Sequence, residues 1–392
     1  MSNAVIELGS LRDSDRKEFS SILKPLRGTR SALVLDPFLM GRLSLMIEMS
    51  FLKQNGVEKI FKLGPIPPER GFDSYVWVLR DNASLIEHVR VHIASSDASV
   101  RNIVVFVPQR TLLAEREFDD VATKIEEICE FPMNLIPFDD DVISLEDHDC
   151  YHATRIDGDQ AHLYGIAHAL MRLQAMFGVI PTIYGKGDYA KQVCDILVKM
   201  RQEVLSDAAA AAAVASGSES IEDADPVPEI GQLVIIDREV DMISPLLLPM
   251  TYEAMIDNVF GITNGHIELE GQIVFPPGTE RKGQPPMPPG KKVFYNLNSN
   301  DPVFVEMRDQ FVGVANKRLA AKSQSIERYI KNRPSAKDSV EALKEWMSKF
   351  APVLAERSSC AVQSHIAADV DRRFNSADFN DELECMQCKY KL

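Results

Sequence analysis

The sequence lacks any hydrophobic run long enough to cross a membrane. A membrane-spanning helix needs roughly twenty consecutive apolar residues, and no such run occurs in this chain of 392 residues. The opening segment, residues 1–19, also lacks the apolar core of a secretory signal. We therefore expect any attachment to membranes to be indirect.

Cysteine is scarce and scattered. Six cysteines in a chain of this length are too few for a disulfide framework, which indicates a reducing compartment such as the cytosol. Cys385 and Cys388 form a C-x-x-C pair, but a zinc site would need two further ligands at comparable spacing. We interpret this pair as part of a helical tail.

An excess of positive charge is also missing. The chain has 43 Lys and Arg against 58 Asp and Glu, a formal net charge of −15. Affinity for nucleic acids and for anionic membranes depends on clustered Lys and Arg. Neither is predicted as a primary ligand.

The common catalytic and cofactor motifs are absent. No G-x-G-x-x-G follows a predicted strand, and there is no complete P-loop, no G-x-S-x-G and no H-E-x-x-H. The loop Gly185-Lys186-Gly187-Asp188 is the nearest thing to a phosphate cradle, but a tight turn between a strand and a helix explains its glycines. No catalytic residue, cofactor or metal is predicted.

The stretch 114–149 is strongly acidic, which favours a solvated face. Its triplet Asp139–Asp141 is interpreted as a turn at a domain junction, because the glycine-containing loop of a calcium site is missing. Just beyond, His148, Cys150 and His152 invite a zinc interpretation. Without a fourth ligand, we interpret them as exposed loop residues.

The first part of the chain alternates strand-like and helical patterns. Apolar runs typical of strands alternate with helical patterns such as 40–52 and 84–93; the runs are 32–35, 57–63, 75–79 and 103–107. This alternation predicts an α/β fold with a parallel sheet over residues 1–138.

Residues 233–262 are the most informative stretch. Leu233–Ile236 is a continuous apolar run, which predicts a central strand covered by helices on both faces. Charged residues follow directly, where open α/β sheets present their polar chemistry; they are Asp237, Arg238, Glu239 and Asp241. After Pro245, Thr251 is placed to cap a helix that begins at Tyr252 and ends at Gly261, and we expect that helix to pack against the sheet.

Two low-complexity segments flank this stretch, and helical periodicity follows it. Residues 207–229 and 275–292 are predicted as a solvated linker and a Pro-rich loop. Beyond residue 300 the spacing predicts helices at 304–329, 339–350 and 353–368, arranged as a helical hairpin. Its first arm carries a basic surface that is a candidate for partner docking or an ordinary solvated face; the candidate residues are Lys317, Arg318, Lys322, Arg328 and Lys331.

The signature stretch resembles a known family. The pattern I-D-R-x-x-D-x-x-x-P-L, from Ile236 to Leu246, followed by T-Y-x-x-x-I-D, from Thr251 to Asp257, is similar to the signature of the SM (Sec/Munc-type) regulators of SNARE-mediated membrane fusion. Within that family the chain resembles the class C vacuolar protein-sorting branch (vacuolar protein sorting thirty-three-like). Residues 104–113, 134–147 and 163–193 support this branch.

The resemblance implies an arch-shaped protein of Rossmann-like parallel-sheet domains followed by an α-helical inserted domain. Residues 1–138 would form the first α/β domain, 139–262 the first half of the second, and 263–392 a partial inserted domain. Compared with the family pattern, the chain is expected to be truncated at its C-terminal end. Asp237, Arg238 and Asp241 would form an internal ion-pair and capping network.

The resemblance also implies a function. We expect a non-enzymatic protein that binds SNAREs within a tethering complex of the HOPS or CORVET type, in vesicle-mediated protein transport. It would be cytoplasmic and peripheral on late endosome, lysosome or vacuole membranes. The alternative is an α/β-fold hydrolase that uses the carboxylates after strand 233–236 for acid-base or metal chemistry.

Overall fold

The structure is a computed structural model that describes residues 6–26, 28–108, 110–214, 228–248, 250–275, 288, 290–332 and 340–389. The chain forms two compact units, Met1–Met242 and Ile243–Leu392. Within the described ranges, no helix combines the length and the apolar composition needed to cross a bilayer.

Unit 1 is built on a five-stranded parallel sheet with the strand order β2-β1-β3-β4-β5. Its central strands consist almost entirely of buried residues, which explains their continuous apolar sequences. The parallel α/β fold is confirmed. The strands are β1 (Ser31–Leu35), β2 (Val57–Lys62), β3 (Ser74–Leu79), β4 (Arg101–Phe106) and β5 (Ile125–Glu130).

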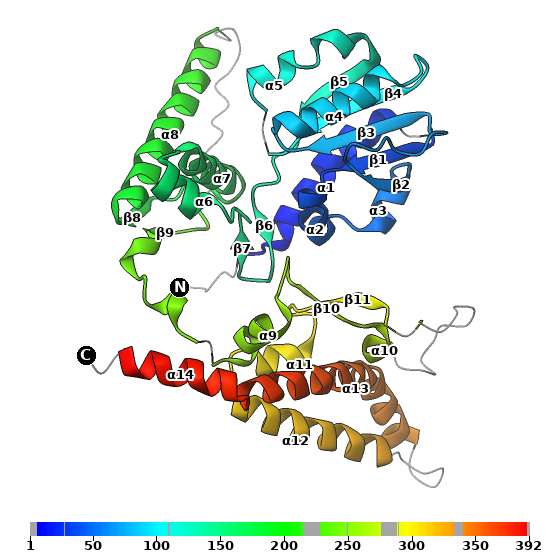
Figure 1. Ribbon diagram of the computed structural model, residues 1–392, viewed down its shortest axis with the longest axis vertical. Coiled ribbons are helices and arrows are strands. Elements are labelled where there is room, and N and C mark those ends of the chain that lie inside the picture. Colours follow the sequence, from blue (N-terminus) through cyan, green and yellow to red (C-terminus); the bar gives the residue numbers. More distant parts are fainter. Residues whose placement is uncertain are drawn as a thin grey trace. The chain divides into compact units, whose positions relative to one another are not determined.

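Helices cover both faces of this sheet (Figure 1). Alternate side chains of β1 point to opposite faces, so that Leu33 and Leu35 pack with one group of helices and Ala32 and Val34 with the other. The first group is α1 (Gly9–Leu23), α2 (Pro37–Met46) and α3 (Met49–Gln54), and the second is α4 (Ala83–Ala94) and α5 (Leu112–Arg116). The helix predicted over 40–52 is therefore two helices, because Ile47 is extended and ends α2.

The edge strand β5 was not predicted. Its sequence, Ile-Glu-Glu-Ile-Cys-Glu, lies in the acidic stretch that we interpreted as a solvated face. The carboxylates of this strand are exposed or paired, as Glu126 is with Arg101. An edge strand tolerates such residues because one side of it faces solvent.

The rest of unit 1 begins with a short hairpin, β6 (Ile136–Pro137) and β7 (Ile143–Ser144). The turn between its strands contains Asp139–Asp141, and the amide of Phe138 donates to the carbonyl of Val142 over 2.9 Å. The triplet therefore forms the predicted turn, and its place at a domain junction stays a prediction. The hairpin is followed by α6 (Cys150–His152), a π-helical turn (Ala153–Asp157) and α7 (Ala161–Phe177).

The strand predicted to be central is β9 (Gln232–Ile236), and that prediction was wrong. Among the described residues, β9 pairs with β8 (Thr182–Lys186) alone, in a two-stranded parallel sheet. Leu233 and Ile235 pack onto α7 and α8 (Asp188–Val214), whereas Val234 and Ile236 are 59% and 61% exposed. The continuous apolar sequence predicts two covered faces, but only one is covered by the described residues.

The predicted linker 207–229 is helical at its start, because α8 continues through the alanine run to Val214. Alanine has the highest helix propensity, so the run extends a helix that is already nucleated. Residues 215–227 lie outside the described residues, as do most of the Pro-rich loop 275–292.

Unit 2 is mainly helical. Its helices are α9 (Tyr252–Phe260), α10 (Gly271–Val274), α11 (Pro302–Met307), α12 (Val312–Lys331), α13 (Val340–Phe374) and α14 (Ala377–Lys389). An antiparallel pair of strands, β10 (His266–Glu270) and β11 (Lys292–Asn296), packs Ile267 and Leu269 into the same core. The predicted hairpin is formed by α12 and α13 (Figure 1).

Two predictions for this region were wrong. The helices expected at 339–350 and 353–368 are one helix, α13, with Pro352 inside it. Packing against α12 outweighs the cost of about 3 kcal/mol for an internal proline. Helix α9 does not pack against a parallel sheet: Tyr252, Met255 and Ile256 lie in the core of unit 2 with residues of α11, α12 and α13. The predicted domain limits at 138 and 262 stay predictions.

Candidate partner-binding site

The hairpin of α12 and α13 has an apolar interior. Leu319 and Ile326 of α12 are buried together with Ile366 and Val370 of α13. The apolar residues of α12 recur at helical spacing and so form one stripe along the helix. The opposite face of α12 is left to solvent.

Aromatic stacking joins α12 to α13 at the end of the hairpin where α12 ends and α13 begins. The rings of Tyr329 and Trp346 lie 6.0 Å apart at an interplanar angle of 8°, and Trp346 stacks on Phe350 at 4.5 Å. The Tyr329 hydroxyl donates to the Trp346 carbonyl over 3.0 Å. The last turns of α12 are thereby joined to the start of α13.

Four of the five predicted docking residues lie on the exposed face of α12. These residues recur over four turns at spacings that keep them on one side of the helix; they are Lys317, Arg318, Arg328 and Lys331. Within the described part of the chain, Lys331 pairs with Glu327 over 3.9 Å, and the other three form no ion pair. We call these four residues the basic stripe.

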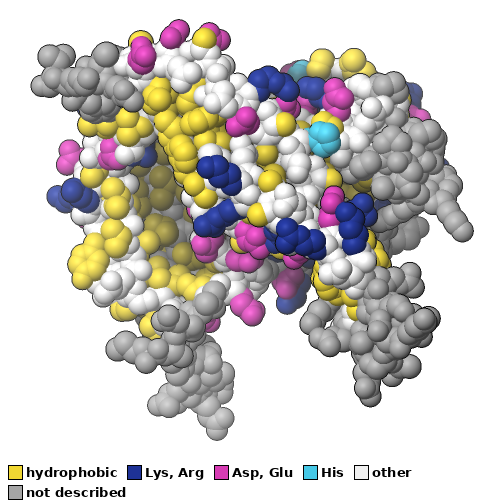
Figure 2. Space-filling model, turned by 90° about the horizontal axis from the view of Figure 1, so that it is seen from below, with side chains coloured by type: hydrophobic (Ala, Val, Ile, Leu, Met, Phe, Trp, Pro, Cys, Tyr) yellow, Lys and Arg dark blue, Asp and Glu magenta, His cyan; other side chains and the backbone are white. Residues whose placement is uncertain are grey.

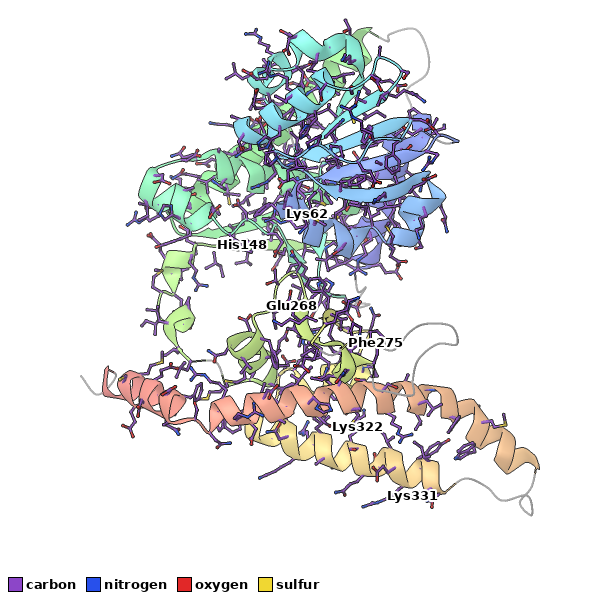
Figure 3. All side chains as sticks on the ribbon, turned by 45° about the vertical axis from the view of Figure 1, so that its right-hand side comes forward. Lys62, His148, Glu268, Phe275, Lys322 and Lys331 are labelled. Carbon is purple, nitrogen blue, oxygen red and sulfur yellow. The ribbon has the colours of Figure 1, made fainter. Side chains whose placement is uncertain are left out.

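Lys322, the fifth predicted residue, lies elsewhere. Its side chain is 13% exposed, and its ammonium lies 2.6 Å from Glu306 and 3.8 Å from Glu356. Figure 3 shows Lys322 on the side of α12 that faces α13, with Lys331 near the far end of α12. The interpretation of Lys322 as a surface residue was wrong, because carboxylates from α11 and α13 hold it inside the unit.

The charges on the face of the molecule shown in Figure 2 are mixed. On the face shown in Figure 2, Lys and Arg side chains lie next to Asp and Glu rather than in a separate basic patch. Salt screens such mixed fields within roughly 8–10 Å.

Asp301 organises the base of the hairpin, and our sequence reasoning missed it. Its Oδ1 accepts from the amides of Val303 at 2.9 Å and Phe304 at 3.1 Å, which caps α11. Its Oδ2 accepts from the Tyr295 hydroxyl at 2.8 Å and the Gln363 side chain at 2.9 Å. An Asp immediately before a Pro at the start of a helix is a capping signal that could have identified it.

The electrostatics of Asp301 follow from these contacts. Burial by itself would raise the pKa of the carboxyl, but the hydrogen bonds that the carboxylate accepts together outweigh it, and the pKa is lowered from the ordinary value; the donors are Ser359, Gln363, the amide of Phe304 and Tyr295. Asp301 is therefore ionised at neutral pH. It joins β11, α11 and α13.

Asp237 of the signature segment is a helix cap. Its Oδ2 accepts from the amide of Tyr189 at 2.9 Å and its Oδ1 from the amide of Ala190 at 2.6 Å, both in the first turn of α8. Gly187 makes this possible: a Cβ there would lie 2.1 Å from Asp237 Oδ2, and its φ of +109° favours glycine. The loop 185–188 is thus a tight turn that receives a carboxylate.

The neighbouring signature residues are exposed. Arg238 donates to the backbone carbonyl of Asp241. Glu239 pairs with Arg155 over 2.7 Å. Pro245 lies in a 3-10 turn, Ser244–Leu246. The structure brings Arg238 and Asp241 together through the backbone of Asp241, and it places Pro245 in the other compact unit.

The second half of the signature stabilises unit 2. Thr251 is the N-cap residue of α9, but its side chain makes no capping hydrogen bond. Tyr252 is 1% exposed, and its hydroxyl donates to Gln363 Oε1 over 3.0 Å; burial raises its pKa. Asp257 accepts from the amide of Ile262 at 2.7 Å and so holds the C-terminal end of α9.

The residues considered for zinc by sequence do not form one cluster. His148 lies 3.4 Å from Glu146, and His152 lies 3.3 Å from Asp157. Cys385 is exposed, and the side chain of Cys388 lies outside the described residues. Cys150 has other neighbours, Asp147 and His162.

Relatives found by sequence comparison match nearly the whole chain. It is 31% identical over 388 residues to the vacuolar protein sorting-associated protein 33A of Rattus norvegicus, with 97% of this chain and 62% of the relative covered. It is 30% identical over 396 residues to the vacuolar protein-sorting-associated protein 33 homolog of Arabidopsis thaliana, with 99% and 61% covered. The chain thus spans less than two thirds of the length of these relatives.

Solved structures share the fold. The SM protein Vps45 in complex with the Qa SNARE Tlg2 matches with a TM-score of 0.61 at 12% identity, covering 94% of this chain and 63% of that one. The Unc18–syntaxin 1 complex from Monosiga brevicollis matches with a TM-score of 0.60 at 14% identity, covering 93% and 63%. A family model described as the Sec1 family matches residues 31–389. That match takes in most of both compact units, and the chain therefore belongs to the Sec1 family.

Proposed function

We propose that this chain is a non-enzymatic regulator of SNARE-mediated membrane fusion that binds SNARE helices through the exposed face of α12. The observation that carries the proposal is the basic stripe. Lys317, Arg318 and Arg328 project from a helix whose opposite face is fixed in an apolar core. The names of two structural neighbours, which are SM proteins in complex with a SNARE or a syntaxin, support this choice of partner.

The mechanism we propose is positioning. A helical hairpin with a rigid interior presents a preformed surface on which extended segments can align before they form a coiled coil. Alignment on a preformed surface lowers the entropy cost of starting that coiled coil. Charge complementarity with acidic SNARE side chains would steer association and fix register, and apolar contacts would supply most of the affinity.

The alternative hydrolase function has less support. The carboxylate of Asp237 accepts hydrogen bonds from two backbone amides of α8, and Glu239 pairs with Arg155. A general base must be oriented toward the proton that it takes from substrate or water. The carboxylates after β9 serve structural contacts instead, which favours a binding protein.

The proposed setting follows from the relatives. Their names place them in vacuolar protein sorting. We propose that the chain acts in vesicle-mediated protein transport as part of a tethering complex of the HOPS or CORVET type. It would be a cytoplasmic protein held on late endosome, lysosome or vacuole membranes by its partners.

The test is a charge reversal in the basic stripe. Lys317→Glu, Arg318→Glu and Arg328→Glu together should lower the association rate constant for a Qa SNARE motif by about tenfold at low salt. The dependence of that rate on salt should weaken as well, because fewer charges attract the partner. Stopped-flow fluorescence with a labelled SNARE motif measures both quantities, and the melting temperature should stay close to that of the parent chain.

A matched control changes net charge by the same amount elsewhere. Lys17, Lys191 and Lys199 are exposed residues of unit 1. Their reversal to Glu should leave the salt dependence and most of the rate intact. If both triple variants slow association equally, long-range charge alone is responsible; if neither does, the SNARE binds another surface.

A further inference from the structure

A cluster of possible metal ligands lies in unit 1, whereas the basic stripe belongs to unit 2. Asp147, Cys150 and His162 bring one ligand atom each to within 4.8 Å of one another. Asp147 is in the loop after β7, Cys150 starts α6, and His162 is in the first turn of α7. The fold therefore assembles three residues from three successive elements.

The distances are close to those of a metal centre. In a tetrahedral zinc site with Zn–N, Zn–O and Zn–S bonds of roughly 2.0–2.3 Å, neighbouring ligand atoms lie about 3.3–3.8 Å apart. Asp147 Oδ2 and His162 Nδ1 are hydrogen-bonded at 2.6 Å, closer than two ligands of one zinc ion, so they would move apart when an ion binds. An ion bound at this place would replace the hydrogen bond between Asp147 and His162.

The surroundings leave room for a fourth ligand. A cavity of about 470 Å³ is lined by Asp147 and His162, and a second of about 320 Å³ by Asp147 and Cys150. The three residues thus lie in the wall between two open spaces. A water molecule or a small ligand can reach a fourth position from either side.

We propose that Asp147, Cys150 and His162 form a binding site for a zinc-type divalent metal ion. Thiolate, imidazole and carboxylate together are typical of zinc, whereas magnesium and calcium prefer oxygen ligands alone. The neighbouring His148 and His152 lie beside Glu146 and Asp157 instead, and the three-residue group does not include them. The site is separate from the proposed SNARE surface and does not depend on it.

Cobalt(II) provides the direct test, since cobalt bound to a thiolate has a charge-transfer absorption. Titration of the chelator-treated full chain with cobalt should produce this band, and zinc should remove it. Cys150→Ser should abolish the band, and His162→Ala should weaken cobalt binding by tenfold or more. His148→Ala and His152→Ala should bind as the parent does. No band in the parent chain, or an unchanged band in Cys150→Ser, would overturn the proposal.

A second measurement needs no variant and so cannot fail through misfolding. Zinc should slow the alkylation of Cys150 in the parent chain several-fold, measured by peptide mass spectrometry. Cys194, a free cysteine of intermediate exposure like Cys150, serves as the internal control, and its rate should not change. Equal alkylation of Cys150 with and without zinc would contradict the site.

Discussion

A single carboxylate, Asp237, closes the turn between β8 and α8. Replacement of Asp237 with Asn keeps the shape of the side chain. It removes the negative charge and one of the two oxygens that accept hydrogen bonds from backbone amides in the first turn of α8. We expect the free energy of unfolding to fall by about 1.5–3 kcal/mol, because hydrogen bonds to a charged group contribute about this much. Urea denaturation followed by circular dichroism measures it.

Glu239→Gln is the control for Asp237, since it removes an exposed carboxylate two residues away. Exposed ion pairs contribute little, so we expect a change of less than about 1 kcal/mol. Equal losses in the two variants would mean that capping by Asp237 adds nothing beyond an ordinary surface contact.

The lowered pKa of Asp301 predicts that the stability of the chain depends on pH. Its pKa is lowered in the folded chain, so its ionised form contributes stability above the ordinary pKa of Asp, and this contribution is lost as pH falls through the lowered value. Asp301→Asn should therefore be less stable than the parent at pH 7, and the difference should shrink below about pH 4. Thermal melts of both chains across this range give the curve.

Asp257→Asn is a suitable comparison for Asp301, since Asp257 is exposed and accepts a hydrogen bond from Ile262. We expect a smaller loss at pH 7. A gap between parent and Asp301→Asn that stays constant with pH would contradict the role of the ionised carboxylate.

Among the elements, the α12–α13 hairpin combines an outer charged surface with an inner ion pair. Lys322→Glu places a third carboxylate beside Glu306 and Glu356. Repulsion at this partly buried position should destabilise unit 2 by about 1–3 kcal/mol.

Lys331→Glu, at an exposed position on the same helix, should change stability by less than about 1 kcal/mol. Guanidinium denaturation of both variants checks this, and a Lys322→Glu variant as stable as Lys331→Glu would show that the inner pair is dispensable.

Sequence periodicity predicted the helices and strands themselves better than the contacts between them. Strands β1 to β4 of the five-stranded sheet and the arms of the hairpin follow from runs and spacings within the elements, whereas the acidic edge strand β5 does not. The partners of Lys322 could not be predicted, because Glu306 and Glu356 come from other helices. The exposed face of β9 could not be predicted either, because a continuous apolar run does not say how many elements cover it.

At the scale of the whole molecule, the chain divides at Met242 and Ile243 into units with separate cores. The core of unit 2 contains α9, β10, β11 and the hairpin. We expect residues 243–392 expressed alone to fold and to melt cooperatively, since their buried apolar contacts lie within the unit. Circular dichroism of this fragment would show a sigmoidal transition, and a gradual, non-cooperative loss of signal would contradict the prediction.

The Asp237 cap also has a practical consequence. It fixes the end of β9 to the beginning of α8, so the chain between Val214 and Pro228 connects two elements whose relative position is already set. Adding residues to such a connection costs little closure entropy. An epitope tag or a dye-labelling sequence placed there should report on the position of the chain in a cell while both ends of the chain remain unmodified.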